Sequence, residues 1–184
     1  MKIMLNIRKH YTIALFSLFI FIIFVTISTL YFMETPAIKE GAKAPDFTLP
    51  SQDGTMVSLS HFIGKKKIVL FFYPKDESYG CTKEACSFRD NYEIFREAGA
   101  EVIGISADDE ASHKSFASNH KLPFILLSDK DRKVASLYNV GKTLGVIPGR
   151  ATFVIDTDGT IRKIFSSQFS FEKHITEALQ ILKK

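Results

Sequence analysis

Two cysteines are the residues of this 184-residue chain whose type and spacing are best suited to chemistry. Cys81 lies between an apolar run that ends at Tyr73 and a helical pattern, and Cys86 follows five residues later. A thiol at the start of a helix lies among unpaired N–H groups at the positive end of the helix dipole, which favours the thiolate. The hydroxyl of Ser78 and the turn-forming Pro74 complete a small anion-stabilising loop. The pattern predicts a reactive Cys81 with Cys86 as a second thiol that can react with it.

The cysteine pair is suited to redox chemistry rather than to structural stabilisation. A disulfide that closes so short a loop removes little chain entropy, and small secreted domains normally carry more bridges. With 46% apolar residues the chain can bury an ordinary core without disulfides. Its net charge of +4 includes Lys2, Arg8 and Lys9, and 4 − 3 leaves about +1 for the remainder. That balance gives no reason to expect a nucleic-acid partner.

The N-terminal part contains 23 consecutive residues without a charge, at positions 11–33. As a helix this segment is long enough to cross a hydrocarbon core of about 30 Å. Basic residues in the tail 1–10 and Glu34 after the segment predict, by the positive-inside rule, a cytoplasmic N-terminus. We therefore expect a single-pass protein of the cell membrane, with its catalytic domain on the exported side.

A cleaved signal peptide is the alternative for this segment. The apolar region of a signal peptide has about 7 to 15 residues and ends in small residues before the cleavage site. This segment is longer, and no Ala-x-Ala-like site ends it. The sequence favours an uncleaved anchor, a linker over 34–42 and one folded domain over 43–184.

The periodicity of apolar residues predicts a mixed α/β domain. Within the predicted strand 67–73, residues 68–73 are continuously apolar, as in a strand covered on both faces. Two hairpins are expected, around Gln52-Asp53-Gly54 and around Thr157-Asp158-Gly159. Strands are predicted over 46–49, 56–59, 67–73, 102–106, 124–127, 152–155 and 161–165, and helices over 83–98, 110–120, 131–138 and 171–182.

Several motifs occur in one order along this domain. They are Pro74-x-x-x-Ser78-x-x-Cys81, the continuation Cys-Thr-Lys-Glu-Ala-Cys-Ser-Phe-Arg-Asp over 81–90, the segment 41–49, and the segment 150–156 that begins with Arg150. Together they resemble the peroxiredoxins, in the group of the bacterioferritin comigratory protein, or PrxQ. The resemblance covers about residues 41–184. It implies a thioredoxin-like sandwich with a mixed central sheet flanked by helices, here preceded by one transmembrane helix.

The resemblance also implies a function and a set of site residues. Cys81 becomes the peroxidatic thiol and Cys86 the resolving thiol of an intramolecular disulfide. Pro74 shields the pocket, Ser78 offers a hydroxyl to the peroxide, and Arg150 stabilises the thiolate and the bound peroxide. The chain is then a thiol-dependent peroxidase for hydrogen peroxide and organic hydroperoxides. We expect a monomer with a thioredoxin-like reductant, without metal or cofactor, and an exported domain would need a reductant outside the cytoplasm.

Two positions depart from the family pattern. Ser78 replaces the usual threonine, which retains the hydroxyl but removes the methyl group that restricts its rotamer. Tyr79 stands where this group usually has proline, so a less rigid loop is expected. Both changes bear on the rate more than on the type of reaction.

The spacing of the cysteines has a mechanical consequence. On one intact helix, five residues separate the Cα atoms of Cys81 and Cys86 by roughly 8–9 Å, and the side chains diverge. A disulfide needs Cα atoms within about 7 Å. The sequence therefore predicts that the first helical turns unwind during each catalytic cycle, with local disorder over about 78–90 in the oxidised form.

Two other classes of protein remain as alternatives. A membrane-tethered thiol–disulfide oxidoreductase would normally carry Cys-x-x-Cys, whereas four residues separate the cysteines here. A copper-binding assembly protein of the Sco type would need Cys-x-x-x-Cys and a distal histidine as soft ligands. The histidines at 61, 113, 120 and 174 are scattered, and we expect them to be solvated or satisfied within the core.

Overall fold

The computed structural model describes Phe19, residues 38–143 and residues 145–183. By its internal contacts the chain divides into two units, Met1–Ala37 and Ile38–Lys184. All elements described below belong to the second unit. Its start lies close to the predicted domain start at residue 43.

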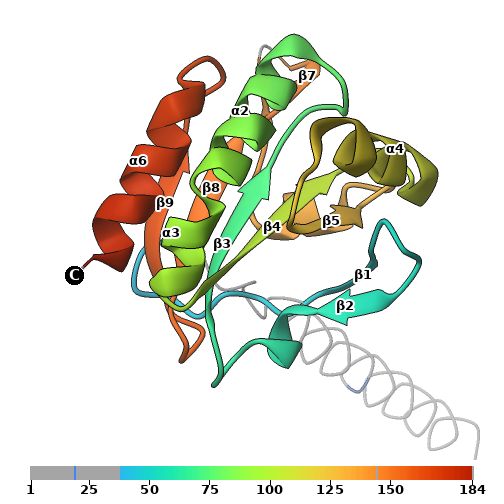
Figure 1. The fold of residues 1–184 in the computed structure, drawn as a ribbon. Coiled ribbons are helices and arrows are strands. Elements are labelled where there is room, and N and C mark those ends of the chain that lie inside the picture. The colour runs from blue at the N-terminus through green and yellow to red at the C-terminus, as the bar shows by residue number, and fades with distance from the viewer. Residues whose placement is uncertain (1–18, 20–37, 144, 184) are drawn as a thin grey trace, which may run out of the picture. The chain divides into compact units, whose positions relative to one another are not determined.

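A five-stranded mixed sheet forms the centre of this unit, in the order β5-β4-β3-β8-β9 (Figure 1). The strands are β3 (Lys67–Phe72), β4 (Ala100–Ser106), β5 (Ile125–Ser128), β8 (Ala151–Ile155) and β9 (Ile161–Ser166). β3 pairs in parallel with β4 and antiparallel with β8, so it occupies the middle of the sheet. This position explains the continuous apolar run over β3, because both faces of the strand are covered.

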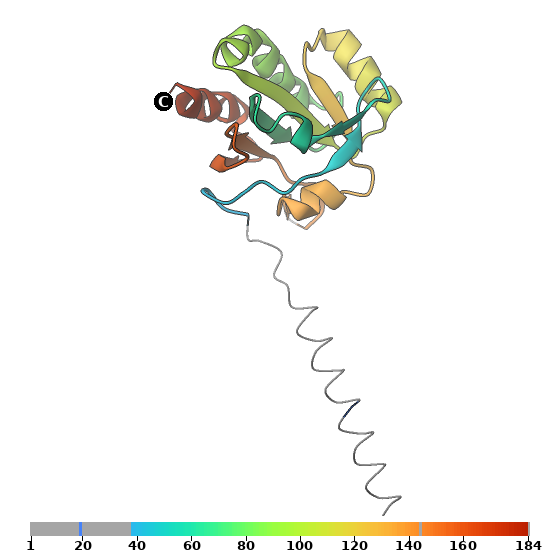
Figure 2. The same cartoon turned by 90° about the horizontal axis from the view of Figure 1, so that it is seen from below.

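Successive side chains of β3 point to opposite faces of the sheet and divide the core into two layers. Ile68, Leu70 and Phe72 belong to one buried cluster, which includes side chains of α5 (Lys133–Leu137). Val69 and Phe71 belong to the other. The second cluster includes side chains of α2 (Tyr79–Asp90), α3 (Tyr92–Glu97), α4 (Glu110–His120) and α6 (Phe171–Leu182). Figure 2 shows α5 on the side of the sheet opposite α2 and α4. The predicted α/β sandwich of the thioredoxin type is confirmed.

Most predicted elements are confirmed with small shifts in their bounds. The first hairpin consists of β1 (Thr48–Pro50) and β2 (Met56–Ser58), and the second of β8 and β9. The predicted helix over 83–98 differs more, because it begins four residues earlier and divides into α2 and α3 at Asn91. Three short elements were not predicted from the sequence, namely the 3-10 turn η1 (Leu59–His61), β6 (Lys142–Thr143) and β7 (Ile147–Pro148).

The predicted transmembrane helix is not supported. Within the described residues, no helix has the length and apolar character needed to cross a membrane. The predicted span over 11–33 lies outside those residues, apart from Phe19. The same holds for the predicted tail over 1–10 and for residues 34–37 of the predicted linker over 34–42.

Candidate active site

The site begins where the chain leaves the central strand β3 and enters α2. Residues 73–78 form the connection, and Ser78 is the N-cap residue of α2. Cys81 therefore lies in the first turn of α2, as predicted, with 1% of its surface exposed. The free N–H groups of this turn and the helix dipole favour a negative charge on its sulfur.

Arg150 lies immediately before β8, which runs beside β3 with Ala151 opposite Phe72. This register brings the buried Arg150 guanidinium to Cys81, and its Nη2 donates a hydrogen bond to Sγ at 3.2 Å. A cationic donor at this distance stabilises a thiolate more than a thiol. The structure thus brings together two predicted site residues that are 69 positions apart.

The other predicted residues lie near this pair with different contacts. The Ser78 hydroxyl donates to the Lys75 carbonyl oxygen at 2.9 Å and makes no capping bond to the helix. Pro74 is half-buried in the same connection. Cys86 is a half-buried free thiol further along α2. Because both cysteines lie on one intact helix, the geometric premise of the predicted unwinding holds.

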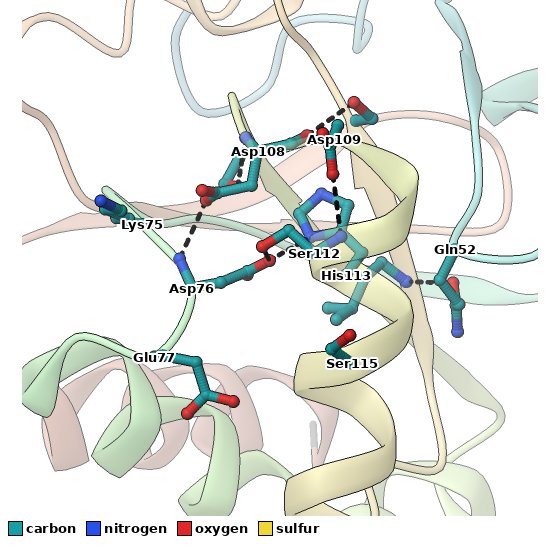
Figure 3. A network of polar contacts seen from close by, with 12 residues as sticks. Gln52, Lys75, Asp76, Glu77, Asp108, Asp109, Ser112, His113 and Ser115 are labelled. Atoms are coloured by element: carbon teal, nitrogen blue, oxygen red, sulfur yellow. Dashed lines mark hydrogen bonds and ion pairs between the residues drawn. The ribbon is translucent and has the colours of Figure 1, made fainter.

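A buried polar cluster attaches the connection to α4, and Figure 3 shows Asp76 directed toward Ser112 and His113 on that helix. Asp76 accepts hydrogen bonds from Tyr73 Oη at 2.7 Å, Ser112 Oγ at 2.8 Å and His113 Nδ1 at 2.9 Å. Burial alone would raise the pKa of Asp76, but these donors, His113 first, hold the pKa below its ordinary value. The backbone N–H of Asp76 also donates to Asp108, so the connection is fixed from both sides. We call Tyr73, Asp76, Asp108, Ser112 and His113 the Asp76 cluster.

A second buried cluster includes Arg150, which contacts Cys81. Arg150 Nη1 donates to Glu84 Oε2, and His174 Nδ1 of α6 lies 3.5 Å from Glu84 Oε1. The Thr152 hydroxyl bonds His174 Nδ1 at 2.8 Å. Burial raises the pKa of Glu84 to about 7, and the attraction of Arg150 only partly opposes this. We call Glu84, Arg150, Thr152 and His174 the Glu84 cluster.

α6 also closes the site by packing. The Phe171 ring lies over the Arg150 guanidinium, 4.9 Å from centroid to Cζ. A Cβ atom at position 80 would lie 2.6 Å from this ring, so Gly80 permits the close approach. Packing against α6 therefore requires a glycine in the first turn of α2, one residue before Cys81.

Sequence reasoning missed the roles of Asp76, Glu84 and His174 in these contacts. One signal was available, because Glu84 lies three residues after Cys81 and such residues share a helix face. His113 and His174 are buried and hydrogen-bonded, which agrees with the expectation of satisfied core histidines. Their partners are distant in sequence, so no local pattern marks them.

A buried thiol beside a cationic donor at a helix N-terminus, on a thioredoxin-like fold, defines a thiol-dependent redox enzyme. The AhpC/TSA family profile matches residues 41–164. Peroxiredoxin Q, chloroplastic, of Oryza sativa subsp. japonica is 55% identical over 146 residues, covering 79% of this chain and 67% of the relative. The Arabidopsis thaliana peroxiredoxin Q, also named as chloroplastic, is 54% identical over 147 residues, covering 79% and 68%.

Solved structures agree with these relatives. The peroxidoxin BcpB of Mycobacterium tuberculosis is 41% identical with a TM-score of 0.74, covering 80% of this chain and 97% of that one. A peroxiredoxin Q of Xanthomonas campestris is 29% identical with a TM-score of 0.70, covering 74% and 90%. The chain belongs to the AhpC/TSA family, within its peroxiredoxin Q group. It is a thiol-dependent peroxidase, and neither the oxidoreductase nor the copper-binding alternative is favoured.

The predicted location in the cell membrane, with an exported catalytic domain, is wrong. The relatives at 51–55% identity are named as chloroplastic, and the described residues contain no helix capable of crossing a membrane. The prediction rested on the apolar run alone. The hydropathy of a segment shows what it can partition into but does not fix where the following domain resides. The expected need for a reductant outside the cytoplasm loses its basis as well.

Proposed function

We propose that Cys81 is the thiol that attacks the peroxide. The observation that carries this assignment is the 3.2 Å contact between Arg150 Nη2 and Cys81 Sγ in the first turn of α2. A thiolate in this position attacks the terminal oxygen of a hydroperoxide and breaks the O–O bond. Cys81 is oxidised to a sulfenic acid, and the leaving oxygen takes a proton to become water or an alcohol.

Cys86 then resolves the sulfenic acid. Its sulfur bonds to Cys81 Sγ, and the hydroxyl of the sulfenic acid leaves as water. Because roughly 8–9 Å separate Cα atoms at this spacing on a helix, the first turns of α2 must unwind before the disulfide forms. A dithiol protein of the thioredoxin type subsequently reduces the disulfide and is itself oxidised.

Pro74 and Ser78 shape the peroxide pocket in this proposal. Their place in the connection fixed by the Asp76 cluster supports the assignment, with the Ser78 hydroxyl leaving the Lys75 carbonyl to meet the substrate. Hydrogen peroxide and small organic hydroperoxides are the proposed substrates. A solved structure of the Xanthomonas campestris bacterioferritin comigratory protein is titled for its alkyl peroxide reduction activity, which supports the organic class. The enzyme acts as a monomer in this proposal.

Two serine variants test the assignment of the thiols. Cys81→Ser should abolish peroxide consumption, because it removes the attacking sulfur. Cys86→Ser should consume about one equivalent of peroxide rapidly and then stop, because the sulfenic acid is not resolved. Mass spectrometry of the trapped sulfenic acid identifies the oxidised residue. Full turnover by the Cys81→Ser variant would refute the assignment.

A further inference from the structure

Glu84 is a fully buried carboxyl group with an incomplete set of hydrogen bonds. One oxygen, Oε2, accepts from Arg150 Nη1. The other, Oε1, has no hydrogen-bond partner within the described part of the chain. The ring atom nearest to it in an ion-pair geometry is Nδ1 of His174, at 3.5 Å. Since buried polar atoms are nearly always satisfied, this pair of atoms calls for a physical explanation.

The contacts of His174 determine which of its nitrogens carries hydrogen. Nε2 lies 2.9 Å from the carbonyl oxygen of Ser167, which can only accept, so Nε2 is the donor. Nδ1 lies 2.8 Å from the Thr152 hydroxyl, which can donate. Burial lowers the pKa of His174 to about 4, so the ring is neutral at neutral pH with its lone pair on Nδ1. An ionised Glu84 would therefore place two acceptors face to face.

We propose that Glu84 carries a proton on Oε1 in the reduced enzyme and shares it with Nδ1 of His174. This proton gives Oε1 a partner after a closure of a few tenths of an ångström, and the Thr152 hydroxyl then turns its own proton away from the single lone pair of Nδ1. It makes His174 a positioning residue that acts through Glu84 and Arg150. The inference rests on the proposed function only in that Cys81 is the reacting thiol.

The charge balance of the site explains the benefit of this proton. Among the described residues, Arg150 is the buried cation that contacts both Cys81 and Glu84. When Glu84 is protonated, the Cys81 thiolate alone balances the positive charge of Arg150. The three buried side chains are then neutral overall. With Glu84 ionised, two anions compete for one guanidinium, which is costly in a buried site.

The groups that face Glu84 are few. Arg150 precedes β8, His174 comes from α6, and Cys81 lies on the same helix face. Burial raises the pKa of Glu84 to about 7 while Arg150 opposes the shift. The proton is thus released near neutral pH, and Arg150 then turns partly from the thiolate to Glu84.

Infrared spectroscopy of the reduced full chain tests the proton directly. A carbonyl stretching band of a neutral carboxyl is expected at about pH 6, with loss of the band as the pH rises through about 7. The band should be absent in Glu84→Gln. It should shift in frequency in His174→Leu, which removes the acceptor. Absence of the band from the wild type at about pH 6, its persistence in Glu84→Gln, or an unshifted band in His174→Leu would overturn the proposal.

The pH dependence of Cys81 oxidation provides a second readout. Glutamine keeps an oxygen for Arg150 and supplies an N–H to His174, so Glu84→Gln mimics the protonated carboxyl without titrating. Above about pH 8 this variant should oxidise about fivefold faster than the wild type in a single turnover with hydrogen peroxide. Glu101→Gln, which removes a carboxylate paired with Lys66 instead, is the matched control and should follow the wild type. Identical profiles for wild type and Glu84→Gln would overturn the proposal. Peroxidase turnover in Cys81→Ser would instead refute the proposed function and leave the infrared result standing.

Discussion

Two buried carboxyl groups flank Cys81, each beside a histidine, and they differ in how many donors reach them. Asp76 receives bonds from a tyrosine, a serine and a histidine. Glu84 receives them from Arg150, and its Oε1 has no hydrogen-bond partner among the described residues. The pKa of Asp76 is lowered, whereas the pKa of Glu84 is raised to about 7. Burial raises the pKa of both carboxyl groups, so the number of hydrogen-bond donors decides whether the net pKa shift is upward or downward.

The histidines differ in a matching way. Nε2 of His113 faces the Leu127 carbonyl at 3.1 Å and Nδ1 faces Asp76, so both nitrogens lie beside acceptors. His174 has a carbonyl on one side and a hydroxyl on the other. The first arrangement gives Asp76 a buried donor, and the second leaves the lone pair of a neutral ring on Nδ1. One cluster therefore fixes the connection before Cys81, and the other can titrate beside the thiolate.

The largest expected effect comes from removing the charge of Asp76. Asp76→Asn should lower the free energy of unfolding by about 3 kcal/mol, because it removes the buried carboxylate that accepts from Tyr73, Ser112 and His113. Urea unfolding at neutral pH measures the loss. The control is Glu77→Gln, which breaks the exposed pair with His120 and should cost less than about 1 kcal/mol. Equal losses in the two variants would show that the Asp76 cluster holds the connection no more firmly than the exposed ion pair does.

The second prediction concerns the dependence of stability on pH. The pKa of Glu84 rises from 4.5 to about 7 on folding, so its stabilising contribution is complete below about pH 4.5 and disappears as the pH rises to about 7. Relative to Glu84→Gln, the wild type should lose on the order of 3 kcal/mol over this range. For Asp76 the contribution to stability changes with pH in the opposite direction. Its contribution is present above its ordinary pKa of 3.8 and disappears as the pH falls through its lower folded value.

Urea unfolding of the wild type, Glu84→Gln and Asp76→Asn over a series of pH values measures how the contributions of Glu84 and Asp76 to the free energy of unfolding depend on pH. The difference between wild type and Glu84→Gln should fall as the pH rises from about 4.5 to about 7. In the same range the difference for Asp76→Asn should be constant. A constant difference for Glu84→Gln as well would show that its carboxyl does not titrate there.

The smallest expected effect comes from removing a single donor. Ser112→Ala should cost only about 1 kcal/mol, because Asp76 keeps its bonds from Tyr73 and His113. Chemical denaturation measures the loss, and Ser115→Ala on the exposed side of α4 serves as control. A loss as large as that of Asp76→Asn would mean that the three donors act as one inseparable unit.

The sequence predicted the elements of this fold well, because apolar periodicity is a local property. The run over β3 and the amphipathic pattern over 171–182 identified a central strand and α6 correctly. The division of the helix at Asn91 was missed, since the apolar stripe continues across it. The transmembrane prediction was unsupported, because the length and hydropathy of a segment do not specify its destination.

The site was only partly predictable for a related reason. Cys81 was identifiable from its place between a strand and a helix, while the role of Arg150 came from a resemblance. Glu84 and His174 carried no distinguishing pattern of their own. Their significance depends on a contact between α2 and α6, and no local rule specifies which faces of two distant helices meet.

By itself, therefore, the sequence determined a thiol at a helix N-terminus, a second thiol too far along the same helix to reach it, and the order of the elements around them. These properties follow from neighbours in the chain. The tertiary structure alone decided that Arg150 contacts Cys81 and that His174 contacts Glu84. The first contact depends on the register of β8 against β3, and the second on the packing of α6 against α2. Both contacts join residues far apart in the sequence, so only the folded chain makes them.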